Sequence, residues 1–334
     1  MAIPILFGIA AAVTGVTGAV KGVKGAIDTK EASDVQERAE SILKRAQRSV
    51  EDTKRSTNLS IQNLGETKLK VCAKQINDFV DSFSKIKVIE LEDSMGLDEL
   101  KKLNITPESI KNMKKTASGA IDVLGGGIAG VGAGVLLGWG TYGGVMALGT
   151  ASTGAAIGGL SGVAATNATL AWLGGGAIAA GGGGMALGTM VLGGIIAGPA
   201  LLVAGGIFGA KAKEKLNNAY SNLSEAKRIV AEIETADSEL KIIANNANQL
   251  NNLIKKLAEM LDRANFGLKQ VVDSEVNWNK YSKAEKNIVA SAMKTAQVVK
   301  TIIDVPLLTK DGVLTKDVQK VLVDKTILAM AGMN

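Results

Sequence analysis

Apolar side chains recur at alternating steps of three and four residues over much of the second half of the chain. Between residues 226 and 271 this spacing continues without a miss. A stripe of more than six heptads is typical of a helix that packs along another helix. The sequence therefore predicts a coiled-coil helix over residues 211–275, with the stripe Ala226, Ile229, Ile233, Ala236, Leu240, Ile243, Ala247, Leu250, Ile254, Leu257, Leu261, Ala264, Leu268 and Val271.

A second amphipathic helix is predicted nearer the N-terminus. Over residues 31–88, apolar residues such as Val35 and Phe79 recur mostly at three- and four-residue steps, and Gly65 offers a place for a bend. A connector with short helices follows and completes a region at 31–115, in which Pro107 is typical of a first helical turn. We expect the two long helices to form an antiparallel pair within one chain, because each would then bury the apolar stripe of the other.

A run without charged side chains separates these two helices. Residues 123–210 contain no Asp, Glu, Lys, Arg or His, although 21% of the whole chain is charged. A charge at the centre of a bilayer costs about 2.5 to 3.5 kcal/mol, which is a physical reason to exclude charges. The run also holds 29 of the 40 glycines, and small residues let helices approach closely in lipid. The region 116–210 is therefore predicted to be a Gly/Ala-rich helical hairpin region that inserts into a membrane, either permanently or on a trigger.

The length of this run allows two or four crossings, because one span needs about 20 residues. The more polar residues 161–169 divide it into two arms, and lysines flank both ends, so an even number of crossings is expected. The flanking lysines expected at lipid headgroups are Lys114, Lys115, Lys211 and Lys213. Aromatic rings of the run fit either the membrane interface or a core beside glycines. The residues expected to insert are Gly125, Gly130, Gly134, Trp139, Tyr142, Asn167, Trp172, Gly176, Gly184 and Pro199.

The two ends of the chain are also predicted to be helical. Residues 1–30 form an apolar glycine-containing helix, which contacts either the membrane or the main body, and no basic residues precede it as in a secretory signal. In the tail, residues 276–334, Ser282 and Glu285 match a capping box, and Pro306 ends the helix that follows. Thr315 is predicted to cap a last helix that continues through Ile327.

Composition excludes several classes of function. Only 3% of residues are aromatic and four are proline, which favours an all-α protein. The absence of histidine removes the usual general base, the commonest metal ligand and the usual pH switch. Gly125, Gly127 and Gly130 match a dinucleotide-binding spacing, but no acidic residue follows until Glu214. We therefore expect no enzyme activity, no cofactor and no metal.

The charge of the chain indicates which partners it is expected to bind. The chain has a net charge of +6, but its basic residues are not interleaved with aromatic residues as in a nucleic-acid interface. Anionic lipid is therefore the expected partner. The single cysteine, Cys72, permits no internal disulfide. We expect a membrane-associated protein that forms a homo-oligomer in lipid; helical protein partners and a soluble cytoplasmic or secreted form stay open as alternatives.

The segment from Ala164 to Gly176, followed by Gly181–Gly184, resembles a stretch of bacterial glycine-zipper proteins. The order of a long helix, an apolar segment, another long helix and a helical tail resembles the helical pore-forming toxins and, more loosely, apolipoprotein L-type proteins. The resemblance to those toxins implies a soluble form that hides its apolar segment against a helix bundle and then inserts and oligomerises. It assigns no role to an individual residue.

Two functions are consistent with this sequence. The first is a membrane-inserting helical protein of toxin or bacterial defence type that forms pores or permeabilises membranes. The alternative is a membrane-anchored coiled-coil scaffold without pore activity. In both cases the expected fold is an elongated bundle or coiled coil of long amphipathic helices around the central apolar region.

Overall fold

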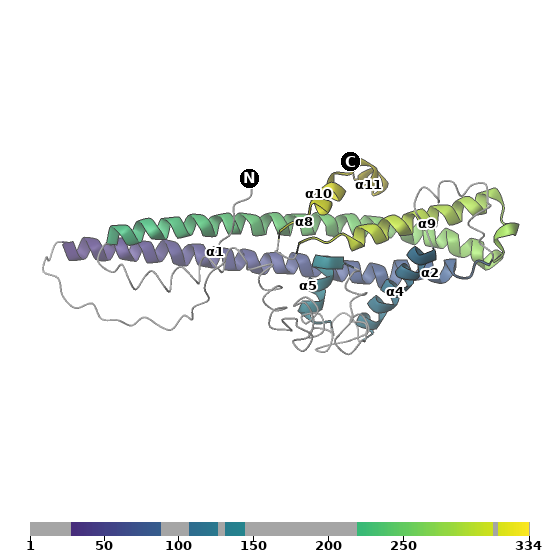
Figure 1. Cartoon of the computed structure of the whole chain (residues 1–334), viewed down its shortest axis with the longest axis horizontal. Helices are drawn as coiled ribbons and strands as arrows, with labels where there is room; N and C mark the ends of the chain where they lie inside the picture. The colour runs from purple at the N-terminus through teal and green to yellow at the C-terminus, as the bar shows by residue number, and fades with distance from the viewer. Residues whose placement is uncertain (1–27, 88–106, 126–130, 144–218, 310–312, 334) are drawn as a thin grey trace. The chain divides into compact units, whose positions relative to one another are not determined.

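The computed structural model describes residues 28–87, 107–125, 131–143, 219–309 and 313–333 (Figure 1). Within them the secondary structure is helical, apart from two isolated bridges, Lys87 with Asn277 and Leu308 with Leu314. The protein is therefore all-α, as predicted. Its helices are α1 (Asp28–Val71), the π-helical turn η1 (Cys72–Ile76), α2 (Asn77–Phe83), α4 (Pro107–Leu124), α5 (Ala133–Tyr142), α8 (Ala219–Ser274), the 3-10 turn η6 (Trp278–Lys280), α9 (Lys283–Asp304), α10 (Lys316–Val323) and α11 (Lys325–Met330).

The chain divides into two compact units. The described residues of the first unit are 28–57 and 219–243, and those of the second are 58–87, 107–125, 131–143, 244–309 and 313–333. In the first unit the Thr57 hydroxyl donates to the Leu240 carbonyl at 3.1 Å, which joins the α1 and α8 portions of that unit. The residues discussed as a functional site below all belong to the second unit.

The helix predicted over residues 31–88 is confirmed as far as residue 83. α1 passes through one π-helical turn into α2, and Val71 and Asn77 on either side of this turn keep right-handed helical backbone angles. Gly65 lies inside α1, and the helix continues through it. Single π-helical turns of this kind are frequent at functional sites.

The periodic stripe of the second long helix is its buried face. Of the fourteen predicted positions, all except Ala264 are buried, and Ala264 is half-buried. Leu253 and Ala258 beside the stripe are buried as well, so this face of α8 is broad. The heptad spacing therefore predicted correctly which face of α8 is buried.

The direction of the helix pair in the second unit differs from the expectation. The Gln75 amide donates to Asp262 at 3.1 Å, and the backbone N–H of Lys87 donates to the Val276 carbonyl at 2.7 Å. From the first hydrogen bond to the second, the residue number rises on both segments, from 75 to 87 and from 262 to 276. The two segments therefore run parallel, and the antiparallel prediction is wrong here. Parallel neighbours need a long connection that brings the chain back to its starting end, and residues 88–218 provide that length.

α9 returns along the second unit after a short turn. Ser282 and Glu285 form the predicted capping box, and α9 ends at Asp304 before Val305 and Pro306. Thr315 caps α10 as predicted. The single last helix that was expected through Ile327 is divided, because the Asp324 carboxylate accepts from the backbone of Thr326 and Ile327 and starts α11 there.

The capping box gives a direct test of the start of α9. Substituting Ser282 with alanine removes the acceptor of the Glu285 backbone N–H, so we expect the free energy of unfolding to fall by about 1 kcal/mol. Urea unfolding followed by circular dichroism measures this change. Ser291→Ala is the matched control, because Ser291 is exposed in the middle of α9 and caps nothing; equal effects of the two substitutions would contradict the prediction.

α4 packs against η1 and α2 in the second unit (Figure 1). It begins at Pro107, as the sequence suggested, and continues to Leu124, inside the charge-free run. Among the helices of the described residues, none combines the length and the apolar character that a membrane span requires.

Candidate functional site

α5 is the described helix that lies wholly within the charge-free run. Its ten residues include Val135, Leu137 and Trp139, which are buried, and Trp139 is only 1% exposed. These side chains therefore lie in the core of the second unit.

Two glycines bring the backbones of α1 and α5 into direct contact. A Cβ atom added to Gly65 would lie 1.9 Å from the Leu136 carbonyl oxygen, and one added to Gly140 would lie 2.1 Å from the Ile61 carbonyl oxygen. No side chain can occupy either position without moving a backbone. This is the close approach that small residues permit between helices, observed here inside the protein.

The C-terminal end of α5 contacts the chain around the end of α9. Gly143 has a φ of +65°, and a Cβ atom there would lie 2.0 Å from the Ile303 carbonyl oxygen. The backbone N–H of Leu307 donates to the Thr141 carbonyl at 2.7 Å. Backbone groups therefore contact α5 at two places. One is the close approach of Gly65 and Gly140 between α1 and α5, which we call the glycine crossing, and the other is the end of α5.

A lysine is buried where these three segments meet. Lys68 is fully buried, and its Nζ donates to the Val305 carbonyl at 3.0 Å and to the Gly140 carbonyl at 3.5 Å. One side chain of α1 thus binds a backbone oxygen of α5 and another just after α9. We call Gly65, Lys68, Gly140, Gly143 and Val305 the α5 docking site.

The environment of Lys68 shifts its ionisation. Burial lowers the pKa of Lys68 to about 7, because water no longer solvates the ammonium form, while the nearby Asp304 carboxylate opposes this shift. Asp304 itself forms an ion pair with Lys300 through Oδ2, and its buried Oδ1 has no hydrogen-bond donor within the described residues. Burial also raises the pKa of the Cys72 thiol to about 12, so this neighbour is uncharged near neutral pH.

Lys68 is the residue that sequence reasoning missed. It stands four residues after Leu64 and four before Cys72, both of which are buried, so it occupies a stripe position of the amphipathic pattern. A lysine at such a position is a visible signal, since buried lysines change protonation readily. In a chain without histidine, it supplies a group that titrates near neutral pH.

The predicted membrane residues lie in several places. Gly125 follows the end of α4, Gly134 lies in α5, and Trp139 is buried beside the glycine crossing. Tyr142 is half-buried, while Lys114 and Lys115 are exposed on α4. Contact of these residues with lipid stays a prediction. Gly130, Asn167, Trp172, Gly176, Gly184, Pro199, Lys211 and Lys213 lie outside the described residues.

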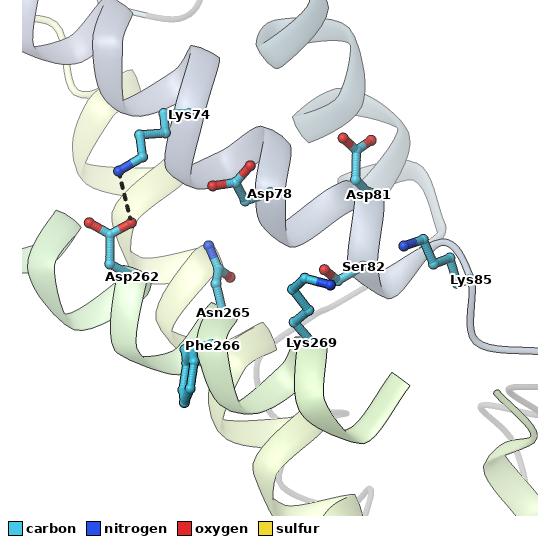
Figure 2. Close-up of a pocket in the computed structure, with 9 residues that line it drawn as sticks. All are labelled: Lys74, Asp78, Asp81, Ser82, Lys85, Asp262, Asn265, Phe266 and Lys269. Atoms are coloured by element: carbon cyan, nitrogen blue, oxygen red, sulfur yellow. Dashed lines mark ion pairs between the residues drawn. The ribbon is translucent and has the colours of Figure 1, made fainter. Parts of the chain in front are cut away.

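A separate hollow of about 420 Å³ opens between the η1–α2 segment and α8. Figure 2 shows its charged side chains around the opening, with Lys74 and Asp262 paired at 3.8 Å. Burial raises the pKa of Asp78 there, against the opposing effect of Lys74. The charges balance, and the described residues contain no cluster of three potential metal ligands. The lining residues are Lys74, Asp78, Asp81, Ser82, Lys85, Asp262, Asn265, Phe266 and Lys269.

Comparisons with protein-family models, curated proteins and solved structures find no match for this chain.

Proposed function

We propose that this chain is a membrane-inserting helical protein that permeabilises bilayers, of toxin or bacterial defence type. The observation that carries the proposal is the absence of every Asp, Glu, Lys, Arg and His over residues 123–210. Maintaining such a run has a clear physical reason if hydrocarbon is its solvent at one stage, because each charge there costs about 2.5 to 3.5 kcal/mol.

The contacts of α5 support a helix that is kept in the protein core and can exchange these contacts for contacts with lipid. Burial of Val135, Leu137 and Trp139 stabilises the docked helix by about 1.5 to 3 kcal/mol for each fully buried side chain, and a lipid environment offers comparable transfer of apolar surface. The glycine face that contacts α1 fits another helix equally well, because small residues favour helix association in lipid. A homo-oligomer in the membrane would replace the contact between α5 and α1 with contacts between copies.

Insertion requires α5 to become longer. Ten residues of helix extend about 15 Å, whereas the hydrocarbon core of a bilayer is about 30 Å thick. The positive φ of Gly143 ends the helix in the docked state. Release of α5 from Ile303 and Leu307 frees this glycine to adopt helical angles, so undocking and helix extension are expected to occur together.

The exposed basic side chains indicate which lipid is favoured. Lys114 and Lys115 are exposed on α4, which leads into the charge-free run, and the whole chain carries a net charge of +6. Basic residues near a membrane surface gain about 1 kcal/mol each from anionic lipid. We therefore propose an anionic bilayer as the partner.

Dye release from vesicles tests the function. We expect the full chain at micromolar concentration to release dye from phosphatidylglycerol-containing vesicles, and less from pure phosphatidylcholine vesicles. Leu192→Lys places a charge in the run and should lower release on the order of 100-fold, since about 3 kcal/mol opposes insertion. Ile121→Lys is the control, because Ile121 is exposed just outside the run.

Each outcome of this assay separates the candidate functions. Vesicles that remain intact and unbound at every lipid composition would contradict membrane insertion. Stable binding without dye release would instead support the membrane-anchored coiled-coil scaffold. Equal activity of Leu192→Lys and Ile121→Lys would show that the charge-free run is not the inserting segment.

A further inference from the structure

The contacts of Lys68 place one ionisable group at the centre of the α5 docking site. Its Nζ reaches Gly140 on α5 and Val305 after α9, and the side chain is fully buried. A neutral amine has two hydrogens, which match these two carbonyl acceptors. An ammonium group has a third hydrogen and a full charge, and it must lose its hydration to occupy the same place.

We infer that Lys68 is a protonation switch for α5: the uncharged amine stabilises the docked helix, and uptake of a proton from solvent favours its release. The switch regulates the segment named in the proposed function and rests on that function for its biological meaning. The docking equilibrium itself exists without lipid, so it can be measured separately.

The titratable groups on the segments around Lys68 come from η1, α9 and α5. The π-helical turn η1 contributes Cys72, whose raised pKa keeps it a neutral thiol, and α9 contributes the ion pair of Lys300 and Asp304. α5 contributes no Asp, Glu, Lys, Arg or His, and its titratable side chain is the phenol of Tyr142. Asp304 is the one group here that favours the ammonium form by its negative charge, and Lys300 already binds one of its oxygens. The docked site therefore compensates the charge of Lys68 only in part.

The direction of the pH effect follows from the two states of the helix. In the docked state the pKa of Lys68 is about 7, whereas a solvated lysine has the ordinary value of 10.5. Between these values the undocked form holds a proton that the docked form lacks, so docking strengthens up to tenfold for each pH unit as pH rises. Below about pH 7 both forms are protonated, and docking reaches its weakest, constant level.

Trp139 is a direct reporter of docking, because it is buried in the docked helix. In a full-length chain with Trp172→Phe and Trp278→Phe, it is the remaining tryptophan. Without lipid, we expect acrylamide quenching of its fluorescence to decrease as pH rises from 7 to 10. A flat quenching profile over this range would overturn the inference.

Three substitutions, at Lys68, Lys70 and Asp304, make the test specific. Lys68→Met should give a quenching profile without this pH dependence, whereas Lys70→Met, at an exposed position two residues along α1, should follow the parent. Where Lys68→Met does not fold, Asp304→Asn serves, since loss of the carboxylate should move the transition to lower pH. An unchanged profile in Lys68→Met or an unchanged midpoint in Asp304→Asn would overturn the switch. A pH-dependent profile together with intact vesicles would instead contradict only the proposed function.

Discussion

Replacing Gly140 with alanine is expected to undock α5 and to expose Trp139 to solvent. The added Cβ atom would lie 2.1 Å from the Ile61 carbonyl oxygen and 2.7 Å from the Ile61 side chain, so α1 and α5 must separate. Overpacking in a tight interior lowers the free energy of unfolding by about 1 to 3 kcal/mol. For Gly140→Ala we expect a loss of about 3 kcal/mol or more, because the added atom meets a backbone atom, which cannot rotate away. Acrylamide quenching of Trp139 and thermal unfolding of the second unit measure the effect.

Gly267→Ala is the matched control for this substitution. A Cβ atom at Gly267, inside α8, would lie 3.2 Å from Cγ2 of Ile288, which is a side-chain atom that can shift. Alanine is also favoured over glycine within a helix by about 1 kcal/mol, so this variant should be as stable as the parent or more stable. A Gly140→Ala chain that keeps Trp139 protected and unfolds at the parental temperature would refute the glycine crossing.

Lys68→Met is expected to change the pH dependence of folding stability. The pKa of Lys68 is lowered to about 7 in the folded protein, so the unfolded chain holds more protons than the folded chain between about pH 7 and 10.5. The parental free energy of unfolding therefore rises with pH in this window and does not change through Lys68 below it. One pKa unit corresponds to about 1.4 kcal/mol, which makes the total effect on the order of 5 kcal/mol.

The comparison of variants isolates this contribution. Methionine cannot donate to Val305 and Gly140, so at pH 10 the Lys68→Met protein should be less stable than the parent. At pH 7 the difference should shrink or reverse, because folding of the parent then requires Lys68 either to give up its proton or to bury its charge. Urea unfolding at both pH values measures the two differences, with Lys70→Met as the control that should show no such change. A pH-independent difference between Lys68→Met and the parent would count against a neutral buried lysine.

Helix positions were the most predictable part of this protein. The stripe along α8 follows from heptad spacing alone, because burial of one helical face requires that spacing whatever the partner is. The start of α9 at Ser282 and its end before Pro306 follow from local capping and from the missing backbone N–H of proline. Such features depend on neighbouring residues and need no knowledge of tertiary contacts.

The features that were not predicted depend on residues far apart in sequence. The parallel direction of the pair in the second unit is set by the contacts of Gln75 with Asp262 and of Lys87 with Val276, and an amphipathic stripe packs equally well in either direction. The sequence offered Gly65 as a place for a bend, whereas its close approach to Gly140 of α5 could not be predicted from it. The role of Lys68 was not predicted for the same reason, because its two hydrogen-bond acceptors lie on other segments.

The hydrogen bonds of Lys68 also imply an order of events during synthesis. Its acceptor on α5 lies 72 residues away along the chain, whereas Val305 lies 237 residues away. At about 5 to 20 residues per second, translation completes α5 on the order of ten seconds before it reaches Val305. In that interval the α5 docking site lacks Val305, so a bilayer or chaperone near the ribosome competes with an incomplete docking site.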